Sequence, residues 1–299
     1  MNNSKILFSI IIPTYNRREI ISKCLYSVLN QTHQNFEIII VDNGSSDKTN
    51  QFILKNFTDE RINYIYQTGS GTPASPRNTG IKNAKYEWIC FLDSDDYWDK
   101  DKLLLIAKEI TKNNKIDVLC HNEKIYYSNK NKFGKTMSYG PYENDFYIKM
   151  LLYGNRMSTS AVTIRKSFLN THDLHFNESK NLITVEDFDL WLRVARAGAY
   201  FKFIKKVLGY YVINNEENLI SNKQLYLKSL DNLIKKHKIF LKEKNNKNED
   251  YFKKIDLRFK FLKLKYLKES NLNFLINFLK ILLKNPYSTL IILIKQIKK

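Results

Sequence analysis

The chain has 299 residues, of which 43% are hydrophobic and 13% are aromatic, and it carries a formal net charge of +19. This length suits one large domain with an appendage or two modest domains, and the apolar share excludes a globally disordered chain. With only 9 glycines, 5 prolines and no internal repeat, a loop-dominated or repetitive architecture is disfavoured.

The first hundred residues alternate apolar runs with helix-like segments. Strands are predicted at residues 8–13, 37–41, 62–66 and 88–92, and helices at 18–30, 47–57, 74–84 and 102–111. The first run ends at Pro13 after a few residues, which is typical of a buried strand rather than a signal peptide. This alternation predicts a mostly parallel sheet covered by helices on both faces, with the ligand at the carboxyl ends of the strands.

The second hundred residues are less regular. Strands are predicted at 117–127, 160–165 and 200–211, helices at 143–153 and 185–197, and a loosely patterned polar stretch at 128–140. The three cysteines, Cys24, Cys90 and Cys120, each lie in an apolar stretch. We expect them to be core residues in a reducing compartment, without a disulfide or a zinc site.

The last part of the chain, residues 216–299, is predicted to be a basic, amphipathic helical tail of three or four helices. From Glu216 onward it has 20 Lys and Arg against 8 Asp and Glu. Because its lysines are mixed with Leu, Ile and Phe, and only 9 of the 49 basic residues in the chain are Arg, we expect an anionic membrane surface rather than nucleic acid as partner.

Two tail segments carry this expectation. Residues 271–284 have Asn and Lys on one narrow face and apolar residues elsewhere, as in a helix lying in the membrane interface. Residues 255–268 have two apolar stripes, one of which would face protein and the other lipid or a partner helix. The alternative for the tail is packing against the rest of the chain or forming a homodimer.

Several carboxylates follow predicted strands directly. Asp42 ends the strand at 37–41, and Asp93, Asp95 and Asp96 follow the strand at 88–92. Parallel strands would bring these groups to one edge of the sheet. Hard oxygen ligands gathered there suit Mg²⁺ or Mn²⁺ holding a diphosphate, since such ions take one or two carboxylates together with substrate phosphates. The alternative is that single Asp residues mark turns and helix starts.

Four segments resemble the ordered motifs of glycosyltransferase family 2. They are SIIIPTYNR (9–17), IIIVDNGSSDKT (38–49), PRNTGIKNAKYEWICFLDSDD (76–96) and VEDFDLWLRVARAG (185–198). The resemblance covers residues 8–215 and implies the α/β GT-A fold with a C-terminal helical extension. Residues 1–215 would form the catalytic domain, with a nucleotide-sugar-binding half at about 1–110 and an acceptor half at about 111–215.

The resemblance also implies roles for individual residues. Pro13 and Tyr15 would line the base and ribose pocket, and Asp42 would accept a hydrogen bond from a uracil-type base. Arg77 would approach the donor, Asp93 would touch the ribose or diphosphate, Asp95 would bind Mn²⁺ or Mg²⁺, and Asp187 would be the catalytic base. The expected supporting residues are Asn78, Ser94, Glu186 and Asn214.

The chain departs from the family pattern after residue 211. Many members have Arg and then His where this sequence has Val212 and Asn214. Asn214 replaces such a His only in part, which puts a third protein contact to the metal in doubt.

Taken together, the motifs predict an inverting glycosyltransferase. The expected donor is a nucleoside-diphosphate hexose or N-acetylhexosamine, by default a UDP-sugar, and the expected acceptor is a lipid-linked glycan of bacterial surface-polysaccharide biosynthesis. The enzyme would be cytoplasmic and peripheral on the inner face of the membrane. The alternatives are a nucleotidyltransferase, which normally needs a Gly-rich loop near the N-terminus, and a non-catalytic binder with the same fold.

Overall fold

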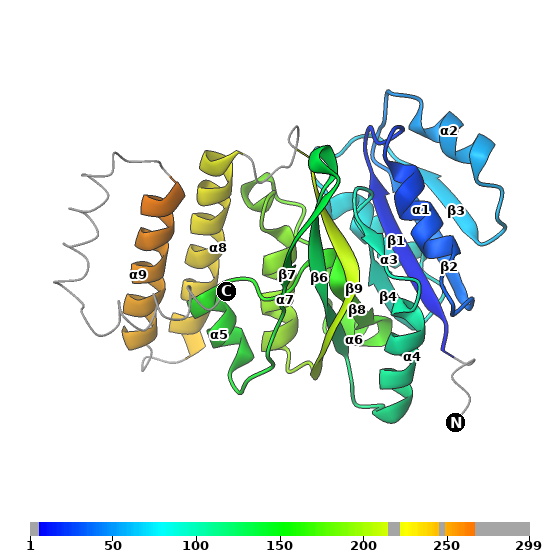
Figure 1. Cartoon of the computed structure of the whole chain (residues 1–299). Coiled ribbons are helices and arrows are strands. Elements are labelled where there is room, and N and C mark those ends of the chain that lie inside the picture. The colour runs from blue at the N-terminus through cyan, green and yellow to red at the C-terminus, as the bar shows by residue number, and fades with distance from the viewer. Residues whose placement is uncertain (1–5, 215–221, 245–248, 267–299) are drawn as a thin grey trace. The chain divides into compact units, whose positions relative to one another are not determined.

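Strands and helices alternate through the N-terminal part of the chain, as the apolar pattern predicts (Figure 1). The computed structural model describes residues 6–214, 222–244 and 249–266. The described residues divide into two units: 6–142 with 156–214, and 143–155 with 222–244 and 249–266.

One mixed sheet of nine strands organises the first unit. Its order is β3-β2-β1-β4-β8-β6-β9-β5, and β7 pairs with β6 outside this path. The strands are β1 (Phe8–Thr14), β2 (Phe36–Asp42), β3 (Ile62–Tyr66), β4 (Trp88–Phe91), β5 (Tyr97–Trp98), β6 (Val118–Tyr127), β7 (Lys132–Met137), β8 (Val162–Arg165) and β9 (Phe201–Ile213). Strands β3, β2, β1 and β4 run parallel to one another, and β6 runs parallel to β9, whereas β8 runs antiparallel between β4 and β6.

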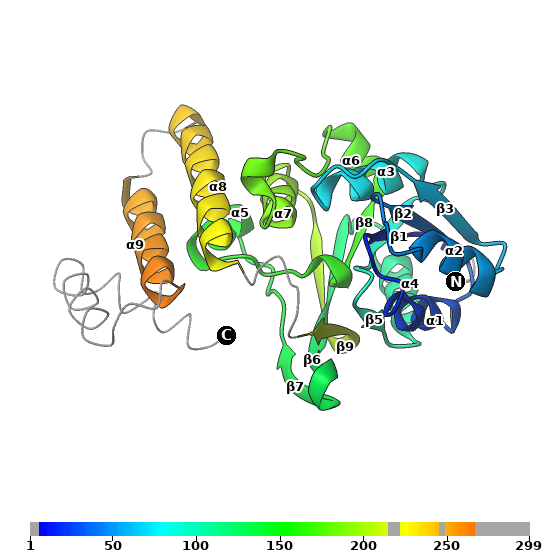
Figure 2. The same cartoon turned by 90° about the horizontal axis from the view of Figure 1, so that it is seen from above.

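Helices cover both faces of this sheet. They are α1 (Ile21–Leu29), α2 (Thr49–Asn56), α3 (Ala74–Asn83), α4 (Lys102–Lys112), α6 (Lys166–Thr171) and α7 (Glu186–Arg196), with short 3₁₀ turns η2 (Ser128–Lys130), η3 (Thr159–Ala161) and η4 (Lys180–Leu182). Figure 2 shows α3 and α6 on one side of the strands and α1 and α4 on the other.

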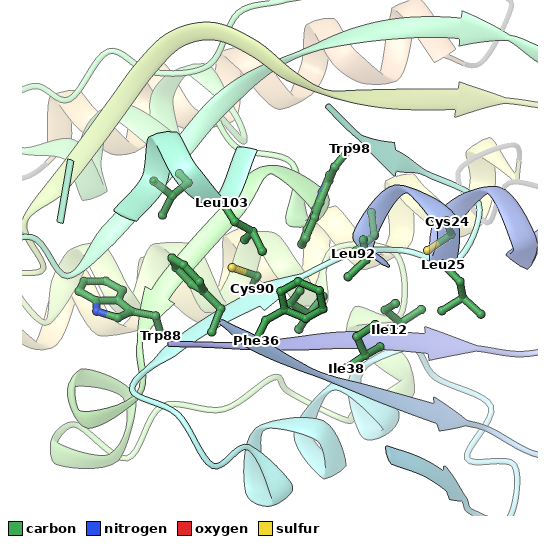
Figure 3. Packing of buried hydrophobic residues seen from close by; sticks show 14 of the residues in the cluster. Ile12, Cys24, Leu25, Phe36, Ile38, Trp88, Cys90, Leu92, Trp98 and Leu103 are labelled. Atoms are coloured by element: carbon green, nitrogen blue, oxygen red, sulfur yellow. The ribbon is translucent and has the colours of Figure 1, made fainter. Parts of the chain in front are cut away.

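The core follows the alternation of side chains along the strands. Every residue of β1 and β2 is buried, as expected for parallel strands covered on both faces. Ile12 and Ile38 face α1 and α4, whose buried residues recur at helical spacing, as Cys24 and Leu103 illustrate (Figure 3). Cys24, Cys90 and Cys120 are all buried and free, which confirms their expected role as core residues.

The other face of the sheet receives α3 and α7. A Cβ at Gly80 in α3 would lie 2.4 Å from Cγ2 of Ile11, so only a glycine lets this helix approach β1 so closely. Phe91, Phe176 and Trp191 form an aromatic cluster with ring centroids 5.3–6.2 Å apart. These contacts bring the start of α7 to the carboxyl edge of β4.

Three elements were not expected from the sequence. Strand β5 has only two residues, β7 lies in the polar stretch expected to lack regular structure, and α6 follows β8 without a helical apolar stripe. Short or polar elements of this kind carry no periodic apolar signal, and the tertiary contacts select them.

The second unit contains α5 (Phe146–Tyr153), α8 (Lys223–Lys244) and α9 (Glu249–Tyr266). Helix α9 contacts both α5 and α8. The buried Arg258 guanidinium donates a hydrogen bond from Nη1 to the Leu151 carbonyl at 2.9 Å. Among the described residues, no helix has the length and apolarity that a bilayer-spanning segment requires.

The two apolar stripes predicted at 255–268 are covered by protein where the structure describes them. Ile255 and Phe259 of the first stripe are buried, and so are Leu257 and Phe261 of the second. The expectation that one of these faces is turned to lipid or to a partner helix is therefore wrong for these four residues. The interfacial helix expected at 271–284 lies outside the described residues.

Candidate active site

The predicted site residues follow the carboxyl ends of β1, β2 and β4. These strands are parallel neighbours, with Thr14 paired with Asp42 and Ile11 paired with Phe91. Pro13 is buried within β1 and lies beyond Ile11, the last residue of β1 that pairs with β4. Proline has no backbone N–H, and at this position none is needed for a hydrogen bond to β4. The loops after β1, β2 and β4 therefore leave the same edge of the sheet.

The loop after β1 is bound to the loop after β2. The Asn16 N–H donates to Oγ of Ser45, and Oδ1 of Asn16 accepts from the Ser46 N–H, each at 2.8 Å. Asn16 has φ 52°, a left-handed conformation that Asn adopts more readily than most residues. This rigid turn leaves Tyr15 56% exposed, and therefore open to a ligand at the edge of the sheet.

Asp42 is fully buried at the end of β2. Its Oδ1 accepts a hydrogen bond from the Ser45 N–H at 2.8 Å, and its Oδ2 accepts one from the Tyr64 hydroxyl. A carboxylate oxygen has two lone pairs, so each can still accept a second hydrogen bond. The expected contact of Asp42 with a nucleotide base stays a prediction.

Arg77 lies between two carboxylates from distant parts of the chain. It is buried in α3, and it donates from Nη2 to Oδ1 of Asp93 and from Nη1 to Oε1 of Glu186, both at 2.7 Å. Its Nε is also buried and has no hydrogen-bond partner among the described residues. The guanidinium, expected from the sequence to approach the donor, thus joins the loop after β4 to the start of α7.

The three carboxylates after β4 have different environments. The side chains of Asp93 and Asp95 are 33% and 24% exposed, and Nη2 of Arg17 lies 3.9 Å from Oδ2 of Asp95. Asp96 is buried and accepts hydrogen bonds from Oγ of Ser160 at 2.6 Å and from the Val212 N–H at 2.9 Å. Asp96 therefore fixes the loop to neighbouring elements, while the other two carboxylates stay partly exposed.

Burial and mutual repulsion affect these groups. Desolvation, followed by the charge of Asp93, raises the pKa of Asp95, and desolvation and the charge of Asp95 raise the pKa of Asp96 well above its ordinary value. The argument from sequence that three adjacent carboxylates call for a cation thus applies to two of them. The third is satisfied by protein donors.

Glu186 and Asp187 begin α7. Oδ1 of Asp187 accepts a hydrogen bond from the Phe188 N–H at 2.6 Å, and Oδ2 accepts one from the Thr159 hydroxyl at 3.2 Å. Desolvation raises the pKa of Asp187, and desolvation also raises the pKa of Glu186 to about 8 in spite of the opposing charge of Arg77. Asp93 and Glu186 thus share one buried guanidinium, whose charge opposes the effect of desolvation on both Glu186 and Asp187.

These contacts close into one ring of side chains. From Asp93 it passes through Arg77 to Glu186 and its neighbour Asp187, and Asp187 is bonded to Thr159. Ser160, next to Thr159, accepts from the Asp93 N–H at 3.1 Å and donates to Asp96. The structure thus brings the carboxylates after β4 together with those at the start of α7, although about ninety positions separate them in the sequence.

The expected supporting residues have varied surroundings. Both ends of the Asn78 amide are bonded to the loop before α7: Nδ2 donates to the Phe176 carbonyl at 2.9 Å, and Oδ1 accepts from the Phe176 N–H at 2.8 Å. Ser94 is buried, and Asn214 is partly exposed directly after β9. The Val212 N–H that bonds Asp96 lies two positions before Asn214, so the chain passes the acidic loop where the family pattern has its His.

The residues fit a divalent ion that keeps substrate ligands. Among the described residues, no group of three or more His, Cys, Asp or Glu side chains is arranged to enclose a metal. Asp93 and Asp95 are partly exposed carboxylates on one loop. Mg²⁺ is usually held by one or two carboxylates and completes its octahedron with phosphates and water. An open site of this kind therefore suits such an ion better than a metal held by protein ligands alone.

Arg17, Thr159 and Ser160 were not expected from the sequence to belong to the site. Arg17 stands inside the first motif, and its guanidinium charge next to a predicted strand end was a usable signal for an anion contact. Thr159 and Ser160 lie in a stretch with no distinctive pattern, and only the tertiary structure relates them to Asp187 and Asp96.

Residues 9–170 match the family model described as Glycosyl transferase family 2. An uncharacterized glycosyltransferase of Rickettsia conorii is 34% identical over 195 residues, which cover 65% of this chain and 31% of that protein. The Escherichia coli UDP-Glc:alpha-D-GlcNAc-diphosphoundecaprenol beta-1,3-glucosyltransferase WfgD is 33% identical over 190 residues, which cover 64% of this chain and 70% of WfgD. The chain spans about a third of the length of the Rickettsia relative.

The fold is similar to that of a solved structure. S. aureus TarS 1–349 in complex with UDP-GlcNAc superposes with a TM-score of 0.60 at 22% identity, covering 90% of this chain and 69% of TarS 1–349. This likeness confirms the predicted α/β GT-A architecture with C-terminal helices. Because the family model covers more than half of the sequence, and the matched range holds β1, β2 and the acidic loop after β4, the chain belongs to glycosyl transferase family 2.

Proposed function

We propose that this chain transfers a hexose or N-acetylhexosamine from a nucleoside-diphosphate sugar, by default a UDP-sugar, to a lipid-linked oligosaccharide of bacterial surface-polysaccharide biosynthesis. Transfer inverts the configuration at the anomeric carbon. The observation that carries the proposal is the ring that joins Asp93 to Asp187 through Arg77 and Glu186. This ring supports one reaction centre in which the leaving group and the attacking hydroxyl meet different carboxylates.

The donor binds along the carboxyl edge of β1, β2 and β4. Tyr15, exposed beside the buried Pro13, offers an aromatic face to the base or ribose, and Asp42 accepts a hydrogen bond from the base. Asp93 touches the ribose or the first diphosphate oxygens. Arg17, close to Asp95, adds a cation on the side where the diphosphate charge develops.

Asp95 would hold a divalent ion, Mn²⁺ or Mg²⁺. When bound, it supplies Lewis-acid neutralisation of the departing diphosphate. Arg77 donates a hydrogen bond to Asp93 on the same loop and so fixes the position of that carboxylate relative to α3. Asn214 lies beyond Val212 and contributes at most a neutral oxygen where family members place a His.

Asp187 is the general base. Its Oδ2 accepts a hydrogen bond from Thr159 at 3.2 Å, and its raised pKa makes the carboxylate a stronger acceptor for the proton of an acceptor hydroxyl. Attack from the face opposite the leaving diphosphate inverts the anomeric centre. The N-terminus of α7 and Arg77 stabilise the carboxylate in its ionised form.

The substrate class rests on the relatives. WfgD, by its name, transfers glucose from UDP-Glc to a diphosphoundecaprenol-linked GlcNAc, and TarS has been solved with UDP-GlcNAc. These names support a UDP-sugar donor and a lipid-diphosphate acceptor for this chain. The specific sugar and linkage depend on loops whose sequences carry no general code.

The test incubates the purified chain with each of a set of UDP-, GDP- and dTDP-sugars and a synthetic pyrophosphate-lipid acceptor, in the presence of Mn²⁺ or Mg²⁺. Mass spectrometry of the lipid product should show the addition of one hexosyl or N-acetylhexosaminyl mass for at least one donor. NMR of the new linkage should show an anomeric configuration opposite to that of the donor.

Two outcomes contradict the proposal. Release of sugar 1-phosphate with transfer of a nucleoside monophosphate would identify a nucleotidyltransferase. Tight binding of a nucleotide sugar without transfer or hydrolysis under any of these conditions would identify a non-catalytic binder.

A further inference from the structure

The hairpin of β6 and β7 carries an unbalanced charge. Between residues 124 and 142 there are four lysines and no Asp or Glu. Lys130, Lys132 and Lys135 are exposed, and none of them forms an ion pair with a residue that the structure describes. Phe133 lies between them in the sequence and is 48% exposed, so the hairpin presents an exposed aromatic side chain together with exposed cations.

The hairpin has a defined shape. Tyr126 pairs with Phe133 in the ladder, and the Tyr126 hydroxyl donates to Oδ1 of Asn131 at 2.7 Å across the turn. Asn131 has φ 45°. A Cβ at Gly134 would lie 2.7 Å from Cε2 of Tyr127, so a glycine is needed for β7 to cross the ring. The lysines and Phe133 therefore lie on a hairpin turn whose backbone conformation is fixed by these contacts.

An aromatic cluster supports the hairpin from below. The rings of Tyr97 and Tyr210 stack with centroids 4.6 Å apart, and Phe133 packs at 5.6 Å from Tyr210 and 5.2 Å from Tyr126. Nζ of Lys23 lies 3.7 Å from the centroid of Tyr97 and 4.1 Å from that of Tyr126. Because the Tyr97 ring already contacts Tyr210 and Lys23, this cluster is poorly suited to stacking a sugar ring, and Phe133 is its most exposed member.

The hairpin turn lies at the same edge of the sheet as the candidate active site. Strand β6 runs antiparallel to β8, which runs antiparallel to β4, so the turn after β6 leaves the edge that also carries Asp93. In Figure 2 the turn lies on the side of the sheet away from α3 and α6. A flat partner that meets the hairpin would thus lie near the edge at which substrates enter.

Two simpler explanations account for part of this pattern. Lysines on an edge strand prevent association with other strands, and β7 pairs only with β6 among the described strands. A basic surface also attracts nucleic acid. Neither explains an exposed Phe between these lysines in the sequence, and the hairpin has no Arg to read bases. Aromatic side chains beside lysines are typical of the interface of an anionic bilayer.

We propose that the β6–β7 hairpin, residues 124–137, docks on an anionic lipid surface. Lys130, Lys132 and Lys135 contact the headgroups, and the Phe133 ring enters the interface. The docked hairpin turns the carboxyl edge of the sheet toward the bilayer. This surface is distinct from the C-terminal tail, and the proposed docking does not depend on which sugar the enzyme transfers.

The first test measures co-sedimentation of the full chain with vesicles of phosphatidylcholine and phosphatidylglycerol, compared with phosphatidylcholine alone. The triple variant K130Q/K132Q/K135Q should lower the partition coefficient for the anionic vesicles by about tenfold or more, because each lysine near such a surface contributes to the attraction. The matched control K55Q/K82Q/K108Q removes the same charge from exposed positions on α2, α3 and α4 and should change it by less than about twofold.

The second test places a reporter at the tip. Trp88, Trp98 and Trp191 are all buried, so Phe133→Trp adds an exposed tryptophan whose emission can be followed above a constant background. Its emission should shift to the blue on addition of phosphatidylglycerol vesicles and should be quenched by brominated lipid. Leu54→Trp, at a position 60% exposed on α2, is the control and should show neither effect.

The proposal is wrong if the vesicles bind the Phe133→Trp chain while its emission is unchanged, since the contact then lies elsewhere. It is also wrong if the lysine triple variant loses affinity for a single-stranded oligonucleotide but not for vesicles. Donor hydrolysis without lipid should be the same in the hairpin variants and the wild type. Failure of membrane docking is thereby separated from failure of the proposed activity.

Discussion

Arg77 and Glu186, more than a hundred positions apart in the sequence, form a buried ion pair with Nη1 and Oε1 at 2.7 Å. The same guanidinium bonds Asp93 at 2.7 Å. Removing one partner of a buried pair leaves an uncompensated charge, whose cost exceeds the value of the pair itself. Arg77 is therefore a positioning residue on which both acidic segments depend.

Arg77→Ala should lower the free energy of unfolding by about 3 kcal/mol or more, because it leaves Glu186 and Asp93 without their cation. Urea denaturation followed by circular dichroism measures this change. Arg61→Ala, which breaks the more exposed pair with Asp59, is the control and should cost about 1 kcal/mol or less. An equal loss of unfolding free energy in the two variants would mean that the Arg77 pair stabilises the fold no more than an exposed pair does.

Asp187→Asn should reduce sugar transfer by about 10²–10⁴-fold, because an amide cannot accept the proton of the attacking hydroxyl. Donor affinity, measured by calorimetry, should stay within about twofold. Asp173→Asn, at a fully exposed side chain, is the matched control and should leave both quantities unchanged. Full transfer activity in Asp187→Asn would assign the base to another group.

The pH profile follows from the raised pKa of Asp187. The base must be ionised, so kcat/KM should fall as the pH drops through this pKa. The acid limb of the pH profile should therefore lie at a higher pH than the ordinary pKa of Asp. Thr159→Val removes a hydrogen bond to Oδ2 that favours the ionised form. The acid limb of this variant should move to higher pH, and a shift in the opposite direction would contradict the assignment.

Asp95 and Asp96 should respond differently to the same substitution. Asp95→Asn should weaken the metal-dependent part of donor binding in calorimetry with little loss of stability, because its side chain is partly exposed. Asp96→Asn should lower the melting temperature, because the buried carboxylate accepts from Ser160 and Val212. Unchanged nucleotide affinity and metal dependence in Asp95→Asn would show that Asp95 is not the metal ligand.

Periodicity was a sufficient guide to most elements. The apolar runs predicted β1, β2 and β3, and the helical spacing of apolar residues predicted α1 and α4, each to within a few residues. These segments are covered on one or both faces by their immediate neighbours, so burial imprints a local pattern on the sequence. Strand β7 has no such cover and therefore no such pattern.

The tail shows the limit of this reasoning. The sequence indicated two apolar faces at 255–268, but a pattern specifies that a face is covered and not what covers it. The structure gathers α5, from the middle of the chain, with α8 and α9, and residues of both stripes are buried. Only a contact between segments more than a hundred positions apart decides this.

The sequence by itself determined which strands end in carboxylates, and the topology of parallel strands put Asp42 and Asp93 on one edge of the sheet. It could not determine which of these carboxylates remain accessible to a ligand. In the tertiary structure Asp96 accepts hydrogen bonds from Ser160 and Val212. Arg77 donates to both Asp93 and Glu186. The side chain of Asp95 stays partly exposed. Motifs record the identity of side chains, whereas burial and hydrogen bonding depend on partners that the chain brings together only when it folds.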